Sequence, residues 1–142
     1  MAAERTEELR RALRAASLRA TPSRIGVLAL LRTISSPVSH GDVADRLASH
    51  GCDRATIYRN LMDLAEAGLA RRTDLGDHVW RFEATSSAHA GAPHPHFVCT
   101  ECGTVECLPD LELAGPKRAR TPRALRTRQV EVHVRGLCDA CA

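Results

Sequence analysis

Four of the six cysteines in this 142-residue chain occur in two CxxC pairs, and these pairs constrain its fold more than any other feature. Cys99 and Cys102 form the first pair, and Cys138 and Cys141 form the second. Two such pairs can supply the four thiolates of a closed tetrahedral zinc site. Gly103, which follows the first pair, suits the tight turn of a zinc knuckle. We therefore expect a structural zinc site, which can contribute on the order of 10 kcal/mol to the folding of a small domain.

The spacing between the two pairs is unusually long. Cys102 and Cys138 are separated by 35 residues, whereas a plain zinc ribbon has roughly 15–20 residues at this point. We therefore expect the metal to hold the last strand and the tail of the chain against the first strand of a small sheet. A thiol oxidoreductase is a competing interpretation, but it requires one reactive pair at a helix start beside a βαβ pattern, which the sequence lacks.

The composition is that of a soluble globular chain long enough for two small domains. Hydrophobic residues make up 44% of the chain and aromatic residues only 3%, so small aliphatic cores need a staple or a partner chain. The net charge of +3 does not by itself indicate nucleic-acid binding. Every basic residue except Lys117 is arginine. Arginine suits phosphate and guanine contacts, although a codon-usage bias explains the enrichment equally well.

The sequence also predicts a cytoplasmic protein. No apolar run reaches the roughly 18 residues of a membrane span, and residues 1–5 lack the apolar stretch of a signal peptide. Cytoplasmic cysteines stay reduced, which favours metal binding over disulfides. We expect no membrane partner, no small-molecule substrate and no enzymatic activity, since neither a catalytic triad nor a glycine-rich phosphate loop is visible.

Periodicity in residues 1–84 predicts four helices followed by a hairpin. Apolar spacing and capping residues place the helices near residues 4–19, 22–33, 40–50 and 53–67. Ser39 opens an approximate capping box, Asp53 caps the fourth helix, and Gly68 ends it. Strand-like runs follow at 69–73 and 78–82. This order is typical of a winged helix-turn-helix domain.

The rest of the chain predicts a linker and a second small domain, which makes the fold class α+β. Residues 85–93 are rich in small and polar side chains and form the expected linker. Within the second domain, residues 94–142, strands are expected at 96–99, 103–108 and 130–134. Prolines at positions 109, 116 and 122 predict a loop, with a short helix near 123–128.

The fourth predicted helix has the composition of a DNA-recognition helix. Its apolar members face a core, which leaves the polar side chains of its N-terminal half directed outward. These outward residues, which can reach phosphates and base edges, are Arg54, Thr56, Tyr58 and Arg59. A solvated surface helix is the alternative, but the preceding helices and the following hairpin favour DNA recognition.

Six short motifs follow one another between residues 18 and 141. They are Thr21-Pro22-Ser23-Arg24, Ser39-His40, ATIYRNL at 55–61, LAEAGL at 64–69, Phe82-Glu83 and HPHFVCTECG at 94–103. Together they resemble the ferric uptake regulator (Fur) family of bacterial metal-dependent repressors, with a zinc-uptake-regulator-like member as one interpretation. The resemblance implies a homodimer that binds palindromic operators in double-stranded DNA, with a winged-helix domain and a zinc-stapled C-terminal α/β dimerisation domain. It also adds Arg24 to the expected DNA contacts.

The resemblance further implies a sensing metal at the hinge between the domains. The family's ligands fall on His40, Glu83, His94 and His96, and the tetrathiolate on the four CxxC cysteines. An ion bound by His40, Glu83, His94 and His96 together would set the angle between the domains. That angle would in turn set the spacing of two recognition helices in a dimer. Taken singly, His40 could be a surface or capping residue and Glu83 an ordinary surface carboxylate. His89 is a weaker candidate.

The chain departs from the family pattern five positions after Cys102. An Asp or Glu often stands there in the family, whereas this chain has Cys107, preceded by Glu106. A thiolate ligand would favour zinc over iron or manganese and would make the site oxidisable. Cys107 could instead be a small buried strand residue. On a regular strand Cys107 and Glu106 face opposite ways, so only one of them can join the sensing site.

A second departure concerns an accessory metal site of many relatives, whose positions here carry residues without suitable side-chain ligands: Pro93, Pro95, Ala114 and Val130. We therefore expect this accessory site to be missing. The expected cofactors are structural Zn²⁺ and a second divalent metal, either Zn²⁺ or Fe²⁺/Mn²⁺, at the sensing site. Competing functions are a peroxide-sensing regulator of the same family, a CxxC thiol oxidoreductase, and a zinc-ribbon interaction module that does not bind DNA.

Overall fold

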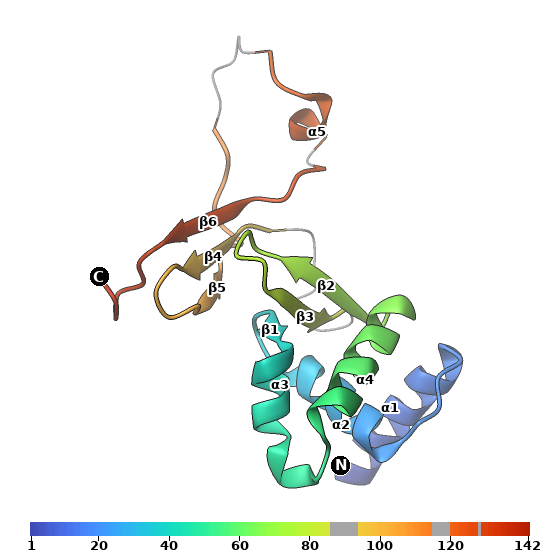
Figure 1. The fold of residues 1–142 in the computed structure, drawn as a ribbon. Helices are drawn as coiled ribbons and strands as arrows, with labels where there is room; N and C mark the ends of the chain where they lie inside the picture. The colour runs from blue at the N-terminus through green and yellow to red at the C-terminus, as the bar shows by residue number, and fades with distance from the viewer. Residues whose placement is uncertain (86–93, 115–119, 128) are drawn as a thin grey trace. The chain divides into compact units, whose positions relative to one another are not determined.

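The computed structural model describes residues 1–85, 94–114, 120–127 and 129–142 (Figure 1). The chain divides into two compact units, an N-terminal unit of Met1–Gly91 and a C-terminal unit of Ala92–Ala142. The division falls within the linker expected at 85–93, most of which lies outside the described residues. Among the described residues, no helix combines the length and the apolar character that crossing a membrane requires.

Four helices form the body of the N-terminal unit (Figure 1). They are α1 (Ala2–Ala15), α2 (Pro22–Thr33), α3 (His40–Arg46) and α4 (Arg54–Glu66), with a short 3₁₀ turn, Ala48–His50, after α3. Side chains cap three of them, and the caps at Ser39 and Asp53 are as predicted. Thr21 accepts from the Arg24 N–H, Asp53 accepts from the Thr56 N–H, and Ser39 and Asp42 form a reciprocal capping box.

The first helix ends four residues earlier than expected, at Ala15 instead of residue 19. Ser17 adopts a left-handed φ of 60°, which stops the helix. The Leu18 N–H then bonds to the Leu13 carbonyl, and the Ser17 N–H to the Arg14 carbonyl. This pair of hydrogen bonds is a Schellman cap. Its early position was missed because the cap normally uses glycine, and the sequence has serine there.

A three-stranded antiparallel sheet completes the winged-helix unit. The order is β1-β3-β2, with β1 at Val38–Ser39, β2 at Ala70–Asp74 and β3 at Trp80–Ala84. The two-residue strand β1 was not predicted, because only its pairing with β3 makes it a strand. The shared core contains side chains with no exposed surface from α1 to α4 and β3: Leu13, Val27, Leu28, Leu31, Val43, Ile57, Leu61, Leu64 and Phe82.

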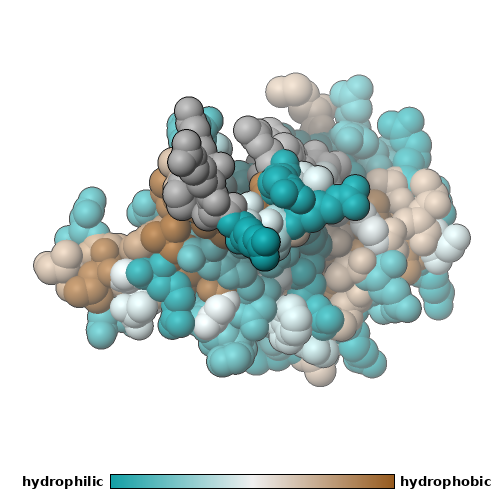
Figure 2. All heavy atoms as spheres, turned by 90° about the horizontal axis from the view of Figure 1, so that it is seen from above, coloured by the Kyte–Doolittle hydropathy of each residue, from teal (hydrophilic) through white to brown (hydrophobic). Residues whose placement is uncertain are grey.

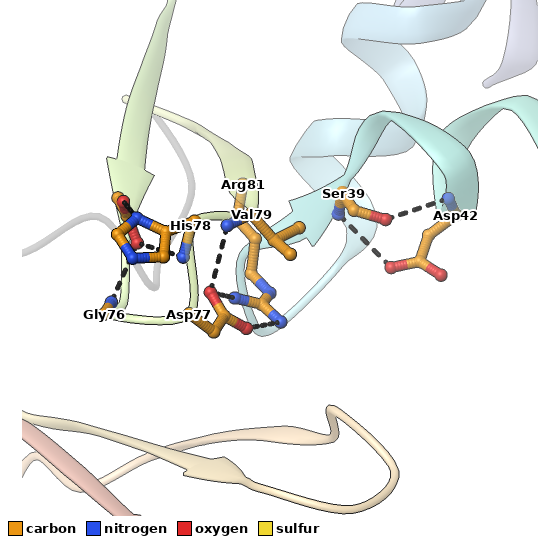
Figure 3. A network of polar contacts seen from close by, with 8 residues as sticks. Ser39, Asp42, Gly76, Asp77, His78, Val79 and Arg81 are labelled. Carbon is orange, nitrogen blue, oxygen red and sulfur yellow. Dashed lines mark hydrogen bonds and ion pairs between the residues drawn. The ribbon is translucent and has the colours of Figure 1, made fainter.

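The turn of the β2–β3 hairpin is held by a buried ion pair (Figure 3). The Arg81 guanidinium donates to both carboxylate oxygens of Asp77, at 2.9 and 2.8 Å, and is only 6% exposed. The Val79 N–H also donates to Asp77. The Arg81 hydrogen bond and the backbone donor lower the pKa of Asp77 below its ordinary value of 3.8. Both hairpin strands lie one or two residues later than predicted, because residues 75–79 form this turn.

The C-terminal unit contains a mixed sheet of order β5-β4-β6 (Figure 1). Strand β4 (His96–Cys99) pairs antiparallel with β5 (Val105–Cys107) and parallel with β6 (His133–Gly136). The last strand therefore begins three residues later than predicted. Its bounds are set by the partner strand, since the four residues of β4 pair with residues 133–136. The short helix α5 spans Arg123–Arg126, and residue 128 lies outside the described residues.

The C-terminal unit buries very little apolar surface. Among its described residues only Val98 and Cys99 are buried. The large hydrophobic side chains that remain exposed in it are Leu111, Leu113, Leu125 and Leu137. Hydrophobic groups also lie open among hydrophilic ones on the molecular face in Figure 2. A unit of about 50 residues with so small a core needs other sources of stability.

Replacing Asp77 with Asn should test the hairpin ion pair. Loss of the charged hydrogen bonds should lower the free energy of unfolding by about 1–2 kcal/mol at neutral pH, allowing for partial solvent screening. Because folding lowers the pKa of Asp77, its contribution is complete above pH 3.8 and is lost as the pH falls through the folded value. Denaturant unfolding of the two proteins should therefore converge in acid. An undiminished difference at pH 2.5 would contradict this assignment.

Candidate metal centres and nucleic-acid interface

The fold brings the four CxxC cysteines together at one end of the C-terminal sheet. Parallel strands β4 and β6 end at the same edge, with Cys99 opposite Gly136. Each CxxC pair begins at or just after this edge, and the potential ligand atoms of all four cysteines lie within 4.8 Å of one another. The two turns also match, because the N–H four residues after the first cysteine donates to its carbonyl in each, from Gly103 to Cys99 and from Ala142 to Cys138. The resulting arrangement fits a tetrathiolate metal site.

The electrostatics of this cluster favour a bound cation. Backbone N–H groups of Cys102 and Cys138 stabilise the Cys99 thiolate and lower its pKa to about 6. The thiols of Cys138, Cys102 and Cys99 raise the pKa of Cys141 to about 12. Four thiolates this close repel one another, so full ionisation requires a positive charge among them. A zinc ion would supply that charge, and the donor set is the one that structural zinc prefers.

A second cluster of potential ligands lies on the same sheet. His94, His96 and Cys107 place one ligand atom each within 4.8 Å of the others. The two imidazole rings are 4.6 Å apart between centroids, and Cys107 is the cross-strand partner of His96. Glu106 instead pairs with Phe97, is exposed, and belongs to the other face of β5. Of the two alternatives raised by the sequence, the structure therefore brings Cys107, and not Glu106, to the histidines.

The other two expected sensing ligands lie in the N-terminal unit. Glu83 on β3 is 5% exposed, and its carboxylate lies 3.7 Å from the Arg71 guanidinium. His40, the first residue of α3, places Nε2 2.8 Å from the backbone carbonyl of Arg54 and packs edge-on against the Tyr58 ring. Neither residue belongs to a group of three or more potential ligands within the described ranges. His89 and Pro93 lie outside those ranges.

The hydrogen bond of His40 determines which of its nitrogens can bind a metal. A carbonyl oxygen only accepts, so Nε2 carries the proton in this arrangement and Nδ1 of the neutral ring has the free lone pair. A histidine ligand whose second nitrogen donates to a backbone carbonyl is a common outer-shell arrangement in metal sites. Here the carbonyl belongs to Arg54, which is the first residue of α4. His40, itself a potential metal ligand, is thus hydrogen-bonded directly to the first residue of α4.

Helix α4 presents a polar face from its N-terminal half. Ile57, Asn60, Leu61 and Leu64 form its buried face. Arg54, Tyr58 and Arg59 are exposed, and Thr56 is partly buried because its hydroxyl and N–H both bond to the Asp53 cap. These hydrogen bonds from Thr56 lower the pKa of Asp53. The exposed residues have the length and donors to reach phosphates and base edges.

Arg24 has different surroundings from the other expected DNA contacts. Its guanidinium bonds to Asp63 on α4 at 2.6 Å and to the Arg19 carbonyl at 2.8 Å, and the side chain is 14% exposed. Beside it, the buried Asn60 amide donates to the Ser23 hydroxyl. These two links between α2 and α4 give Arg24 a role in positioning α4. Sequence reasoning missed the links, because their partners are 39 and 37 residues apart.

His133 also lies beside a candidate site. Its side chain is 23% exposed and pairs with Glu131 at 3.5 Å. On β6 it stands opposite His96 in the parallel register. Only the pairing of β6 with β4 reveals this position, because the strand predicted at 130–134 begins three residues before β6.

Comparison with known proteins agrees with these features. The Ferric uptake regulator family matches residues 15–134. The ferric uptake regulation protein of Legionella pneumophila is 31% identical and aligns 91% of this chain with 95% of its own. The peroxide operon regulator of Bacillus subtilis is 25% identical over 100% of this chain and 97% of its own. The crystal structure of the Vibrio cholerae ferric uptake regulator matches with a TM-score of 0.67 and 23% identity, covering 91% of this chain and 98% of that one.

The matched family covers most of the chain, and the winged-helix unit and two thiol-containing clusters described above occur within one sequence. The chain therefore belongs to the ferric uptake regulator family of metal-responsive transcriptional regulators.

Proposed function

We propose that this protein is a repressor that binds palindromic operators as a homodimer and is switched by zinc or iron. The observation that carries the proposal is the contact of His40 with the Arg54 carbonyl. One expected sensing ligand is thereby hydrogen-bonded to the first residue of the helix that would read DNA. The proposed sensing ligands are His40, Glu83, His94 and His96, and the proposed structural zinc ligands are the four CxxC cysteines.

The contact of His40 suggests how metal occupancy would affect DNA binding. An ion at Nδ1 would keep the Nε2 hydrogen bond and fix the ring, whereas an ion at Nε2 would replace that bond. In either case the Arg54 carbonyl and the Tyr58 ring respond to the same imidazole. Metal binding at His40 would therefore act directly on α4 within the N-terminal unit. Such a contact is what allows a ligand to select a DNA-competent conformation.

The composition of the C-terminal unit supports a homodimer. Its described residues bury only Val98 and Cys99, and four of its leucines remain exposed. Packing those leucines against a second copy would remove apolar surface from water at about 25 cal/mol per Å². A closed twofold dimer would then present two α4 helices to half-sites about one DNA turn apart.

Two other interpretations make different demands. A peroxide-sensing regulator would oxidise a metal-bound histidine, with peroxide as the oxidant. A thiol oxidoreductase needs a reactive CxxC pair, whereas both pairs here form one four-thiol cluster. We therefore place metal-responsive repression first and retain peroxide sensing as the alternative within the family.

Replacing Arg59 with Ala should weaken operator binding by about 5- to 150-fold, because one base or phosphate contact contributes about 1–3 kcal/mol. Arg59 is exposed on α4, and its hydrogen bond to the Thr56 hydroxyl is long, at 3.5 Å, so the fold should be little affected. Fluorescence anisotropy with operator DNA measures affinity, and metal analysis checks that the metal content is unchanged. Arg126→Ala, at an exposed arginine on α5, is the matched control. Equal affinity of the Arg59 variant and the native protein would exclude this contact.

Metal titration should show that operator affinity depends on the second centre. The protein with only its structural zinc should gain affinity when zinc, iron or manganese is added anaerobically, and His96→Ala should lose that gain while it remains a folded dimer. His50→Ala, at an exposed histidine, is the control. The sensing assignment is wrong if the His96 variant responds to metal as the native protein does.

Replacing Cys102 with Ala should disrupt the tetrathiolate instead. We expect loss of the tightly bound zinc and a shift from dimer to monomer, because the C-terminal unit has so small a core. The N-terminal unit has its own core and should remain helical. Metal analysis, sedimentation velocity and circular dichroism give the three readouts, with Cys52→Ala as the control. A zinc-free dimer as stable as the native one would contradict a structural role.

A further inference from the structure

We propose that Cys107 is a thiolate ligand of the second centre and that this ligand makes zinc the metal to which the protein responds. The inference rests on the proposed function, because it names the effector of the proposed sensing site. It depends on three observations about the C-terminal sheet: the type of cross-strand pair, the proline between the two histidines, and the surroundings of Cys107.

The cross-strand pair of His96 and Cys107 is the kind that brings side chains closest together. The Leu108 N–H donates to the Pro95 carbonyl on one side of the pair, and the Cys99 N–H donates to the Thr104 carbonyl farther along the ladder. Hydrogen-bonded pairs alternate with non-hydrogen-bonded ones, so residues 96 and 107 form a non-hydrogen-bonded pair. The Cα atoms of such a pair are about 4.5 Å apart and their side chains are neighbours on one face.

Pro95 favours the same face for His94. A proline restricts the residue before it to extended backbone, and its own φ is fixed near −65°. His94 and His96 therefore alternate about Pro95 and point the same way. Two imidazoles and one thiol then lie within 4.8 Å of one another with little backbone freedom left to lose. Such a set of ligands is arranged for a metal before the metal binds.

The surroundings of Cys107 argue against a simple packing role. A structural cysteine is usually fully buried and behaves as a small hydrophobic residue, whereas Cys107 is only partly buried. The described part of this unit has a core of just two residues, Val98 and Cys99, and Cys107 is not one of them. Cys52 is a useful contrast, because it is also partly buried but belongs to no potential ligand cluster within the described ranges.

The chemistry of these ligands favours zinc. Thiolate and imidazole ligands suit zinc, whereas carboxylates and other oxygen ligands suit manganese. The thiolate of Cys107 is therefore the ligand that would set the metal preference of this centre.

Cobalt provides a direct test, because thiolate–cobalt bonds give charge-transfer absorption. The full-length protein, with its tightly bound zinc retained in the tetrathiolate, is titrated with Co²⁺ without oxygen. The native protein and Cys52→Ser should show this absorption for one added equivalent, whereas Cys107→Ser should bind cobalt without it or not at all. Persistence of the same absorption in Cys107→Ser would overturn the proposal. Zinc content and circular dichroism confirm that each variant is folded.

Metal competition tests the selectivity. Zinc and manganese compete for the second centre in the native protein and in Cys107→Asp, which replaces the thiolate with a carboxylate. We expect the preference for zinc over manganese to fall at least about tenfold in this variant. Mutation of outer-shell residues alone already lowers metal affinity by about that factor. An unchanged ratio would refute the role of Cys107 in selectivity. Operator binding is measured separately: a metal-independent affinity with normal cobalt spectra would refute the repressor switch and leave the thiolate assignment standing.

Discussion

The pairing of β4 with its two neighbours is the interaction on which both candidate metal centres depend. Its parallel pairing with β6 brings the ends of two strands to one edge, and a CxxC turn follows each strand there. Its antiparallel pairing with β5 places Cys107 beside His96. One four-residue strand thus positions the ligands of both clusters, so the register of this small sheet determines the metal chemistry of the C-terminal unit.

The same sheet is too small to be stable by hydrophobic burial alone. With Val98 and Cys99 as its buried residues within the described ranges, the unit lacks the apolar area that normally offsets conformational entropy. A metal-bound tetrathiolate and a second copy of the chain would each add stability to this unit. A metal bound by the four cysteines would crosslink residues 36 to 42 positions apart in the sequence, and dimerisation would cover exposed leucines. Folding, metal binding and assembly are therefore expected to be coupled in this unit.

The N-terminal unit has the opposite character. Its core is continuous from α1 to β3, and buried polar links from Ser23 and Arg24 hold α2 against α4. A rigid scaffold of this kind allows a small change at His40 to reach α4 without being lost in local flexibility. The bidentate pair of Asp77 and Arg81 similarly fixes the hairpin turn (Figure 3). The packing of this unit is therefore as rigid as a metal-dependent change in α4 would require.

The family, the fold class and most helix positions followed from local sequence, because caps, turns and apolar periodicity act over a few residues. The capping box at Ser39, the Asp53 cap and the glycine after α4 are of this kind. The two CxxC pairs likewise indicated a tetrathiolate, since two such pairs supply the four thiolates of a closed zinc site.

Contacts between distant residues were decided only by the tertiary structure. Strand β1 exists because β3 pairs with it, and β6 begins at His133 because β4 determines its register. The position of Cys107, and not Glu106, beside the histidines has the same cause, because a one-residue change of register exchanges the two faces of a strand. The bond from His40 to Arg54 and the engagement of Arg24 by Asp63 also join segments far apart in the chain. Local sequence constrains short segments, whereas packing determines which side chains meet.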